Sequence, residues 1–289
     1  MDDYPNITVP QCGIGRQSLL SNGNCFQWFQ SNQSLIPPHE LNNGRNAGPA
    51  EVPFAVWIQR TDRVYGSGVI INRRWILTAA HVVFQIRVSD IKIYPGKLFI
   101  NINGYNDDGY DVEKTVIQPY YESNQHPATD LALVKLTVDL PLIDTNVGLL
   151  LHPYRTLNGI CLPMANQHND RDELALMAGY GKVTDTNRSD RLRMGYIRIR
   201  AAVRNETDYW RIVILGQRYP QYNGTFSCPG DSGAPLYQYV NGRAVLIGIH
   251  QGINDGYWIK CHEINDYVFG VFPRVSYFTE WISDTINKN

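Results

Sequence analysis

Short apolar runs separated by turn residues recur along the chain from about Leu41 onward. The clearest runs are predicted to be strands, at residues 52–58, 68–71, 75–78, 236–240 and 244–249. The last two runs flank Asn241-Gly242, a pair that favours a two-residue hairpin turn because both turn positions need positive φ. Short strands repeated at this spacing predict an all-β fold, either a sandwich or a barrel.

The two ends of the chain depart from this pattern. Residues 1–40 are rich in Asn, Gln, Ser, Gly and Pro and show little periodicity, which indicates an extension. Near the C-terminus, apolar residues recur at spacings of three and four and predict one amphipathic helix: Phe278, Trp281, Ile282 and Ile286. We therefore expect an N-terminal extension over 1–40 and one domain over 41–289.

Composition and charge exclude several classes of function. The chain has 289 residues, of which 43 % are hydrophobic, and this is enough for a sizeable core. A formal net charge of −1 provides no electrostatic footprint for a nucleic acid. The longest apolar runs, such as Val69-Ile70-Ile71, are far too short to cross a bilayer. We expect neither a nucleic acid nor a membrane as a partner.

The first four residues, Met1-Asp2-Asp3-Tyr4, lack the basic and apolar regions of a signal peptide. We nevertheless expect a secreted glycoprotein from which a signal has been removed, and the cysteines described below are the stronger reason. Sequons of the Asn-X-Ser/Thr type are a weaker one, at Asn6, Asn32, Asn187, Asn205 and Asn223.

Three segments carry residue types suited to nucleophilic catalysis. They are 77–81, which ends in His81, 130–136, which begins with Asp130, and 228–236, in which Ser232 stands among Gly and Pro. Taken singly, they are typical of a surface histidine, a strand-capping aspartate and a tight loop. A serine hydroxyl, however, becomes a good nucleophile when an imidazole takes its proton and a carboxylate orients that imidazole. The three together, in the order His, Asp, Ser, predict acyl transfer.

These segments resemble the chymotrypsin-like, or trypsin-like, serine peptidase family. Other matching segments are 41–47, 75–81, 161–163, 178–181 and 270–275, so the resemblance runs from about Leu41 to Ile286. It implies two six-stranded antiparallel β-barrels followed by a C-terminal α-helix, with the active site in the cleft between the barrels. It also implies that the protein is made as a zymogen whose propeptide lies in residues 1–40.

The family's catalytic roles carry over to the matching positions of this sequence. Ser232 would be the nucleophile, His81 the general base and then the general acid, and Asp130 the carboxylate that orients His81. Backbone N–H groups of Gly230 and Ser232 would form the oxyanion hole.

The resemblance also implies how the enzyme is activated. Leu41 matches the start of the mature enzyme, and Asp231 would form a buried ion pair with the amino group freed there. Zymogens of the family are commonly cut after Arg or Lys, whereas the residue before Leu41 is Glu40. An activator that requires a basic residue therefore does not fit this chain.

The resemblance places the primary specificity pocket at Phe226, Gly252 and Gly270. Family members that cut after Arg or Lys carry a carboxylate at the position of Phe226. Without that partner a buried guanidinium is costly, so we expect Arg and Lys to be poor at the cleavage position. The volume of the Phe226 ring leaves small apolar side chains, or an occluded pocket, as the expected alternatives.

Two further features of the family pattern are missing from this sequence. Gly66 and Val82 replace the two cysteines that usually form a disulfide beside the catalytic histidine, so both partners have been lost together. The serine that normally supports the triad aspartate is replaced by His250 or Gln251, depending on where a one-residue gap is placed. This leaves the support of Asp130 open.

The chain has five cysteines, at positions 12, 25, 161, 228 and 261. The resemblance implies a Cys228–Cys261 disulfide, and it implies that Cys161 holds the propeptide to the catalytic domain. The partner of Cys161 would be Cys12 or Cys25, and we expect Cys25 because it lies closer to Leu41. One cysteine is then left over. Two pairs fit a secreted disulfide framework better than a reduced cytosolic protein.

The predicted function is that of a serine endopeptidase acting through an acyl-enzyme. The alternative is a weak or inactive homologue that binds or regulates other proteins. The sequence has no His-Glu-x-x-His and no Cys-x-x-Cys spacing, so we expect no metal and no cofactor. The expected partners are protein or peptide substrates, with an activating protease and protein inhibitors as candidates.

Overall fold

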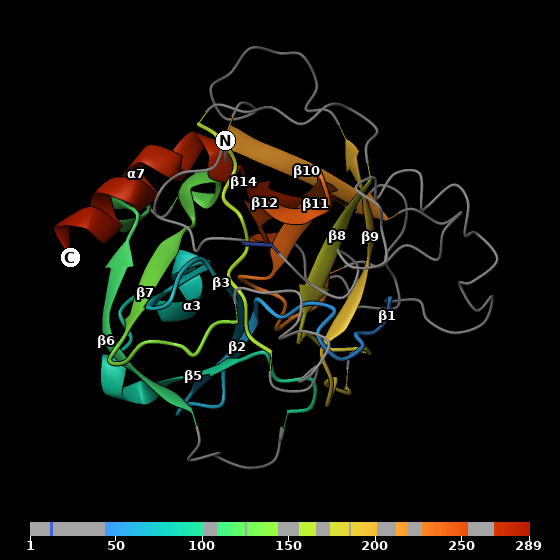
Figure 1. Cartoon of the computed structure of the whole chain (residues 1–289), viewed down its shortest axis with the longest axis horizontal. Helices are drawn as coiled ribbons and strands as arrows, with labels where there is room; N and C mark the ends of the chain where they lie inside the picture. Colours follow the sequence, from blue (N-terminus) through green and yellow to red (C-terminus); the bar gives the residue numbers. More distant parts are fainter. Residues whose placement is uncertain are drawn as a thin grey trace.

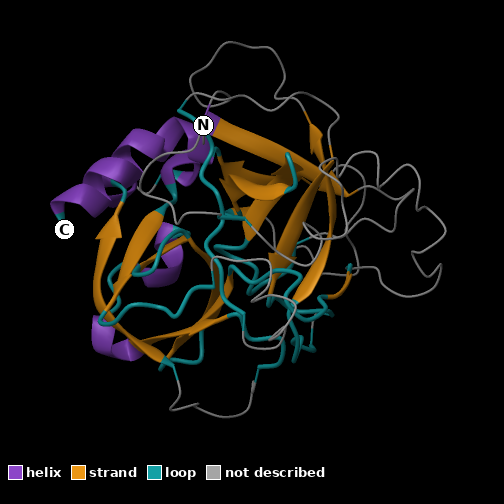
Figure 2. Ribbon diagram, in the orientation of Figure 1, coloured by secondary structure: helices purple, strands orange, loops and turns teal. Residues whose placement is uncertain are grey.

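The strands form two sheets that lie side by side (Figure 1). In this computed structural model the described residues are 12–13, 44–100, 109–124, 126–143, 156–165, 174–184, 186–200, 212–218, 227–253 and 269–289. The first sheet is a closed barrel, and the second is an eight-stranded curled sheet. This confirms the predicted all-β fold, and Figure 2 shows how few helices accompany the strands in the described part.

The barrel has the strand order β2-β3-β4-β7-β6-β5, with every neighbouring pair antiparallel. Its strands are β2 (Ala55–Arg60), β3 (Tyr65–Ile70), β4 (Trp75–Thr78), β5 (Ile91–Pro95), β6 (Tyr110–Ile117) and β7 (Ala132–Leu136). Short helical segments connect them: α3 (Ala80–Val83), η2 (Val88–Asp90), α4 (Pro119–Asn124) and η3 (Pro127–Thr129).

The second sheet has the order β12-β11-β8-β9-β10-β14-β13, and β1 pairs with β9 beside this path. Its strands are β1 (Arg45–Asn46), β8 (Leu174–Gly179), β9 (Arg193–Arg200), β10 (Val213–Arg218), β11 (Pro235–Val240), β12 (Arg243–Ile249), β13 (Gly252–Ile253) and β14 (Phe269–Pro273). A bridge between Gly248 and Arg274 joins β12 to the end of β14, so the sheet curls round on itself.

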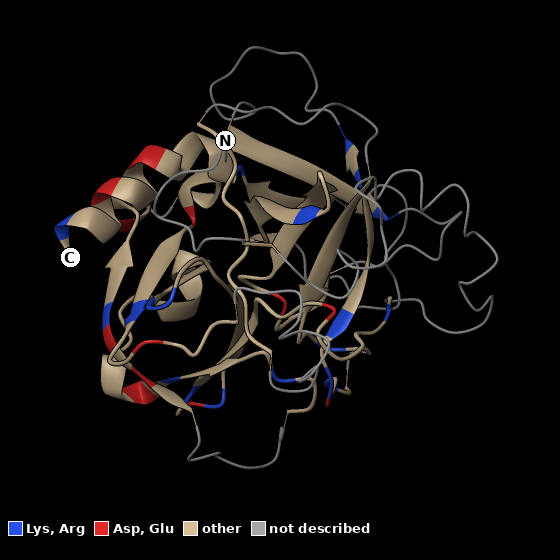
Figure 3. Cartoon of the chain, in the orientation of Figure 1, with Lys and Arg blue, Asp and Glu red and all other residues tan. Residues whose placement is uncertain are grey.

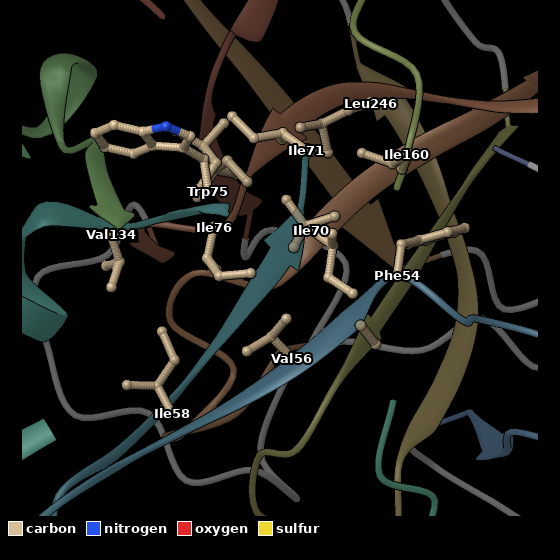
Figure 4. Packing of buried hydrophobic residues seen from close by; sticks show 14 of the residues in the cluster. Phe54, Val56, Ile58, Ile70, Ile71, Trp75, Ile76, Val134, Ile160 and Leu246 are labelled. Carbon is tan, nitrogen blue, oxygen red and sulfur yellow. The ribbon is translucent and has the colours of Figure 1, made fainter. Parts of the chain in front are cut away.

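A shared apolar core joins the two sheets. Phe54, just before β2, packs edge-on against Tyr237 of β11 with ring centroids 5.1 Å apart. Figure 4 shows Phe54 and Ile70 from the barrel in the same cluster as Leu246 of β12. Burying such side chains contributes about 1.5–3 kcal/mol each, so this contact fixes the two sheets against each other.

The predicted hairpin joins β11 to β12. Val240 pairs with Arg243 across the turn, and Asn241 and Gly242 have φ values of 50° and 77°. Both are positive, as a turn of this type requires, because its twist then matches that of the flanking strands.

The predicted amphipathic helix is α7 (Val275–Lys288). It buries Phe278 and Ile282 and exposes Glu280. Its end reaches the barrel, where Lys135 of β7 donates a 2.6 Å hydrogen bond to the Asn289 carbonyl oxygen. The helix therefore begins at the second sheet and ends against the first, as Figure 1 shows. None of the described helices is long and apolar enough to span a membrane.

Charged residues of both signs are interspersed over the described elements (Figure 3). Several form surface ion pairs, such as Lys92 with Asp111 at 2.7 Å and Lys135 with Glu113 at 2.9 Å. Exposed pairs of this kind contribute at most about 1 kcal/mol each, so the core rather than surface charge holds the fold together.

A disulfide between Cys12 and Cys161 ties the N-terminal region to the second sheet. The neighbouring Gly13 N–H donates to the Gly159 carbonyl at 2.7 Å, and the Gly13 carbonyl accepts from the Ala244 N–H at 2.9 Å. A Cβ on Gly13 would lie 2.4 Å from the Ala244 oxygen, so only glycine allows this approach.

The expected pairing of Cys161 with Cys25 is therefore wrong, although Cys161 is joined to residues 1–40 as predicted. Proximity to Leu41 along the sequence did not decide the partner. The decisive feature is the docking of Cys12-Gly13 on β12, which brings the two Cα atoms within 4.9 Å of each other. Cys25 lies outside the described residues.

We predict that non-reducing peptide mapping will find the Cys12 peptide linked to the Cys161 peptide. Cys12→Ser should remove this link and lower the free energy of unfolding by about 2–4 kcal/mol, because the disulfide closes a long loop. Cys25→Ser is the matched control and should keep the Cys12–Cys161 link. Finding Cys25 linked to Cys161 would contradict the structure.

Candidate active site

Strand register brings His81 and Asp130 together. Thr78 at the end of β4 pairs with Ala132 at the start of β7. His81 lies three residues after Thr78, on α3, and Asp130 lies two residues before Ala132, after η3. In an antiparallel pair the end of one strand faces the start of the other, so both residues emerge at the same rim of the barrel.

The carboxylate of Asp130 holds His81 through two contacts. Its Oδ1 accepts a 2.8 Å hydrogen bond from the His81 backbone N–H, and its Oδ2 lies 2.6 Å from the ring Nδ1. Because an ionised carboxylate only accepts, Nδ1 carries the proton and Nε2 of the neutral ring keeps its lone pair. Asp130 is 1 % exposed, whereas the His81 side chain is 37 % exposed. Asp130 thus fixes the ring at Nδ1, while the His81 side chain as a whole stays partly exposed to solvent.

Ser232 lies in a loop of the second sheet that is attached to the first. Its carbonyl accepts a 2.7 Å hydrogen bond from the Ser67 N–H of β3. Gly66 lies on the same strand, and a Cβ added to it would lie 2.6 Å from the Val82 side chain and 3.2 Å from the Ser232 carbonyl oxygen. Because Val82 follows His81 directly, the structure brings the backbone of Ser232 and the helix that carries His81 to one place.

The contact between Gly66 and Val82 shows what occupies the place of the missing disulfide. Gly66 and Val82, which replace the family's two cysteines, are direct neighbours, and the valine methyl groups fill the space beside the glycine. Apolar packing has replaced the covalent bond at this point.

Gly233 allows the loop to approach the barrel. Its φ is 86°, and a Cβ there would lie 2.0 Å from the Ser67 oxygen and 2.2 Å from Thr78 Oγ1. Thr78 Oγ1 itself donates to the Ser67 carbonyl at 2.7 Å. A side chain at position 233 would therefore push the Ser232 loop off the barrel.

The predicted oxyanion-hole groups have a suitable conformation. Gly230 has a φ of 102°, which favours glycine, and its carbonyl accepts from the Ser67 hydroxyl at 3.2 Å. Within the described part of the chain, the N–H groups of Gly230 and Ser232 donate no hydrogen bond. Two backbone donors next to a candidate nucleophile thus have no acceptor among the described residues.

Asp231 is buried between two backbone donors. It is 9 % exposed, and its carboxylate accepts from the Gly181 N–H at 2.8 Å and from the Cys228 N–H at 2.9 Å. Burial raises the pKa of Asp231 to about 6, although both hydrogen bonds and the charge of Arg193 act in the opposite direction. The described surroundings of Asp231 therefore provide too little positive charge to offset the cost of burying its carboxylate.

The remaining predicted site residues are only partly placed. Gly252 pairs with Val271, and Gly270 pairs with Ile253, so both glycines lie on the β13–β14 ribbon. Among the described residues, nothing lies within 4 Å of an ideal Cβ on Gly252. Cys228 is disulfide-bonded. The predicted residues Leu41, Phe226 and Cys261 lie outside the described residues.

Neither candidate for supporting Asp130 makes that contact. The Gln251 N–H donates to the Val271 carbonyl at 2.9 Å, and the His250 N–H donates to the Ala234 carbonyl at 2.8 Å. Among the described residues, no hydrogen bond joins either side chain to Asp130. His81 alone supplies the donors that the Asp130 carboxylate accepts from in this part of the chain.

The comparisons with known proteins agree with this geometry. A family model described as Trypsin matches residues 41–282. The chain belongs to the trypsin family. This confirms the resemblance seen in the sequence, and family membership implies peptidase function.

Three relatives illustrate the range of the trypsin family that this chain resembles. The venom peptide isomerase heavy chain of Agelenopsis aperta is 29 % identical over 259 residues, covering 83 % of this chain and 97 % of that protein. Chymotrypsin-like elastase family member 1 of Macaca fascicularis is 26 % identical, covering 94 % and 97 %. Human tissue-type plasminogen activator is 29 % identical, covering 78 % of this chain and 40 % of that protein.

We predict that Gly233→Ala will lower the free energy of unfolding by about 2 kcal/mol or more, because of the positive φ and the clash with Ser67. The melting temperature should fall by about 5 °C or more. Gly252→Ala is the control, since its Cβ meets open space among the described residues, and it should change stability by less than about 0.5 kcal/mol. Equal melting temperatures for the two variants would refute the role given to Gly233.

Proposed function

We propose that this protein is a serine endopeptidase, made as a zymogen, with Ser232, His81 and Asp130 as its catalytic triad. The observation that carries the proposal is the His81–Asp130 pair, held at 2.6 Å beside the attached Ser232 loop. Membership in the trypsin family supports peptide-bond hydrolysis as the reaction.

The proposed reaction uses the free lone pair of His81 Nε2. Nε2 takes the proton of the Ser232 hydroxyl while Oγ attacks the carbonyl carbon of the scissile bond. The oxyanion that forms accepts hydrogen bonds from the N–H groups of Gly230 and Ser232. His81 then gives its proton to the leaving amine, which leaves an acyl-enzyme.

Water completes the cycle. His81 takes a proton from water as the water oxygen attacks the ester, and it returns that proton to Ser232 Oγ as the acid product leaves. Asp130 stays ionised throughout and stabilises the imidazolium, since its carboxylate faces Nδ1 at 2.6 Å.

Activation would supply the charge that Asp231 lacks. Cleavage after Glu40 would free the amino group of Leu41. Gly44, three residues further on, already lies at the second sheet, where its carbonyl accepts a 2.9 Å hydrogen bond from Arg193. An extended segment of three residues spans about 10 Å, so the new terminus has the reach to enter the region around Asp231.

Secretion is part of the proposal. The Cys12–Cys161 disulfide and the bonded state of Cys228 support an oxidising compartment. Proteins or peptides are the proposed substrates. Arg and Lys should be poor at the cleavage position, because Phe226 offers no carboxylate to a buried cation.

We predict that Ser232→Ala will abolish peptide hydrolysis and labelling by a fluorophosphonate while leaving the melting temperature within about 2 °C of the parent. Asp130→Asn should keep the fold but lower kcat by about 10⁴, because it changes the His81 tautomer. Undiminished hydrolysis by Ser232→Ala would refute the triad. A folded parent, cut before Leu41, that takes up no label would favour the non-catalytic homologue.

We predict that the uncut protein loses stability as the pH rises from about 4 to about 7. The pKa of Asp231 is raised to about 6 in the fold, so the folded state binds the proton more tightly than the unfolded state in this range. The Asp231 contribution is fully present below the ordinary pKa of 3.8 and is lost as the pH passes 6, by up to about 3 kcal/mol.

The control for this measurement is Asp231→Asn, which should flatten the difference between pH 4 and pH 7 in the uncut protein. In protein cut between Glu40 and Leu41, pairing with the new amine should likewise remove the penalty and switch on hydrolysis in the parent only. Equal pH profiles for the uncut parent and Asp231→Asn would contradict this account of activation.

A further inference from the structure

A buried histidine lies directly behind the Ser232 loop. His250 is 3 % exposed. Its backbone is bonded to the loop on both sides, since the Gly233 N–H donates to the His250 carbonyl at 2.8 Å and the His250 N–H donates to the Ala234 carbonyl at 2.8 Å. His250 is thus as firmly placed as the candidate nucleophile itself.

The imidazole of His250 has no hydrogen-bond partner on either nitrogen among the described residues. Its ring packs edge-on against Phe272, with centroids 5.2 Å apart. The backbone carbonyl groups of Asp231 and Gly252 lie close enough to raise the pKa of the ring, but neither meets the distance and angle of a hydrogen bond. A buried polar group without a partner costs about 1–3 kcal/mol, so the His250 ring calls for a partner beyond the described residues.

The position of His250 suggests what that partner is. Gly252, which faces open space among the described residues, follows two residues later. Phe272, which packs against the ring, lies two residues after Gly270 on β14. Gly252 and Gly270 are the two described residues of the predicted specificity pocket. The imidazole therefore packs against the strand that carries Gly270, in a segment whose backbone is bonded to the Ser232 loop.

We propose that His250 determines specificity by donating a hydrogen bond to the carboxylate oxygen of Glu or the amide oxygen of Gln at the residue before the scissile bond. This inference rests on the proposed peptidase function. It replaces the earlier expectation of a small apolar side chain, which took only Phe226 into account.

The protonation state of the His250 ring determines whether a substrate with Gln or one with Glu binds better. Burial and the nearby charge of His81 lower the pKa of His250 to about 3, so the free ring is neutral near neutral pH. A neutral imidazole has one N–H donor, and the amide oxygen of Gln accepts it without burying charge. A Glu carboxylate also accepts this bond, but it must keep its charge or take up one proton from solvent. Gln is therefore the better of the two.

Other side chains leave the imidazole unsatisfied. A cation has no partner there, and an apolar side chain fills the space without accepting the N–H. Sites built to bond a polar substrate group reject analogues that lack it by large factors, because a buried polar group is then left unpaired. We expect a preference of at least about 100-fold for Gln over Met, which has similar size and no strong acceptor.

The same chemistry assigns the activating protease. The residue before the predicted mature start is Glu40, an acceptor-bearing side chain. The chain's own Glu40–Leu41 bond thus has the residue that the His250 pocket accepts. The activator is then a second copy of this protein, which accounts for the absence of Arg or Lys at this position.

The first experiment uses the full chain with residues 36–40 replaced by Asp-Asp-Asp-Asp-Lys, so that enteropeptidase frees Leu41 whatever the chain's own specificity. Active sites are counted by fluorophosphonate labelling. Peptides that differ only in the residue before the scissile bond (Gln, Glu, Met, Ala or Arg) are then compared by kcat/KM. Gln and Glu should exceed Met, Ala and Arg by at least about 100-fold.

The variant His250→Val should lose this preference while it keeps its fluorophosphonate labelling and a melting temperature equal to or above that of the parent, since an unpaired buried polar group is removed. Gln251→Ala is the matched control. Successive side chains of an extended segment point to opposite faces, so this change should leave the Gln-to-Met ratio unaltered.

The second experiment uses the uncut Ser232→Ala chain as the substrate for activated parent protein. N-terminal sequencing should show a new chain that begins at Leu41. Glu40→Gln in this substrate should be cut at least as fast, and Glu40→Ala should resist. Activated His250→Val should cut none of them at this bond.

Two results separate the possible failures. Labelling of Ser232 together with a Gln-to-Met ratio that His250→Val does not change would overturn this inference and leave the proposed function intact. Neither labelling nor turnover in folded protein with Leu41 freed would overturn the proposed function, and this inference with it.

Discussion

The hydrogen bond from the Ser67 N–H to the Ser232 carbonyl is the contact on which the candidate site depends. His81 and Asp130 belong to the barrel, and Ser232 belongs to the second sheet, so nothing within either sheet alone brings the three together. The contact is possible because Gly233 has no side chain. A Cβ there would collide with the Ser67 carbonyl oxygen and with the Thr78 hydroxyl that donates to this oxygen. The register of β4 and β7 brings His81 to Asp130, and this attachment adds Ser232 to the pair.

Two groups around this contact are poorly satisfied, and both lie where function needs a partner from elsewhere. Asp231 has backbone donors but too little positive charge, and His250 has no hydrogen-bond partner on its ring among the described residues. Local conflicts of this kind reduce stability and persist where the complete assembly resolves them. For Asp231 the proposed partner is the freed amine, and for His250 it is a substrate side chain.

Some of this could be predicted from the sequence, because it depends on local pattern. The Asn241-Gly242 hairpin and the C-terminal helix follow from turn chemistry and periodicity. The His81–Asp130 contact required only that both residues flank paired strands. The partner of Cys161 could not be predicted, since it depends on where Cys12-Gly13 docks. The role proposed for His250 does not follow from the sequence, where the matching family residue is a serine. Only the contact of its ring with Phe272 and the backbone bonds to the Ser232 loop show where the imidazole lies.

The backbone of one short segment connects the residues proposed for activation with the residue proposed for specificity. The Ala234 N–H donates to the Asp231 carbonyl, the His250 N–H donates to the Ala234 carbonyl, and the Gly233 N–H donates back to His250. A shift of Asp231 toward a new amine would, on the proposed assignments, be passed within a few bonds to the segment that carries the imidazole. On the proposed assignments, cleavage after Glu40 completes the same pocket that recognises Glu40. The first molecules activated then process the rest, which makes activation depend on the concentration of the protein itself.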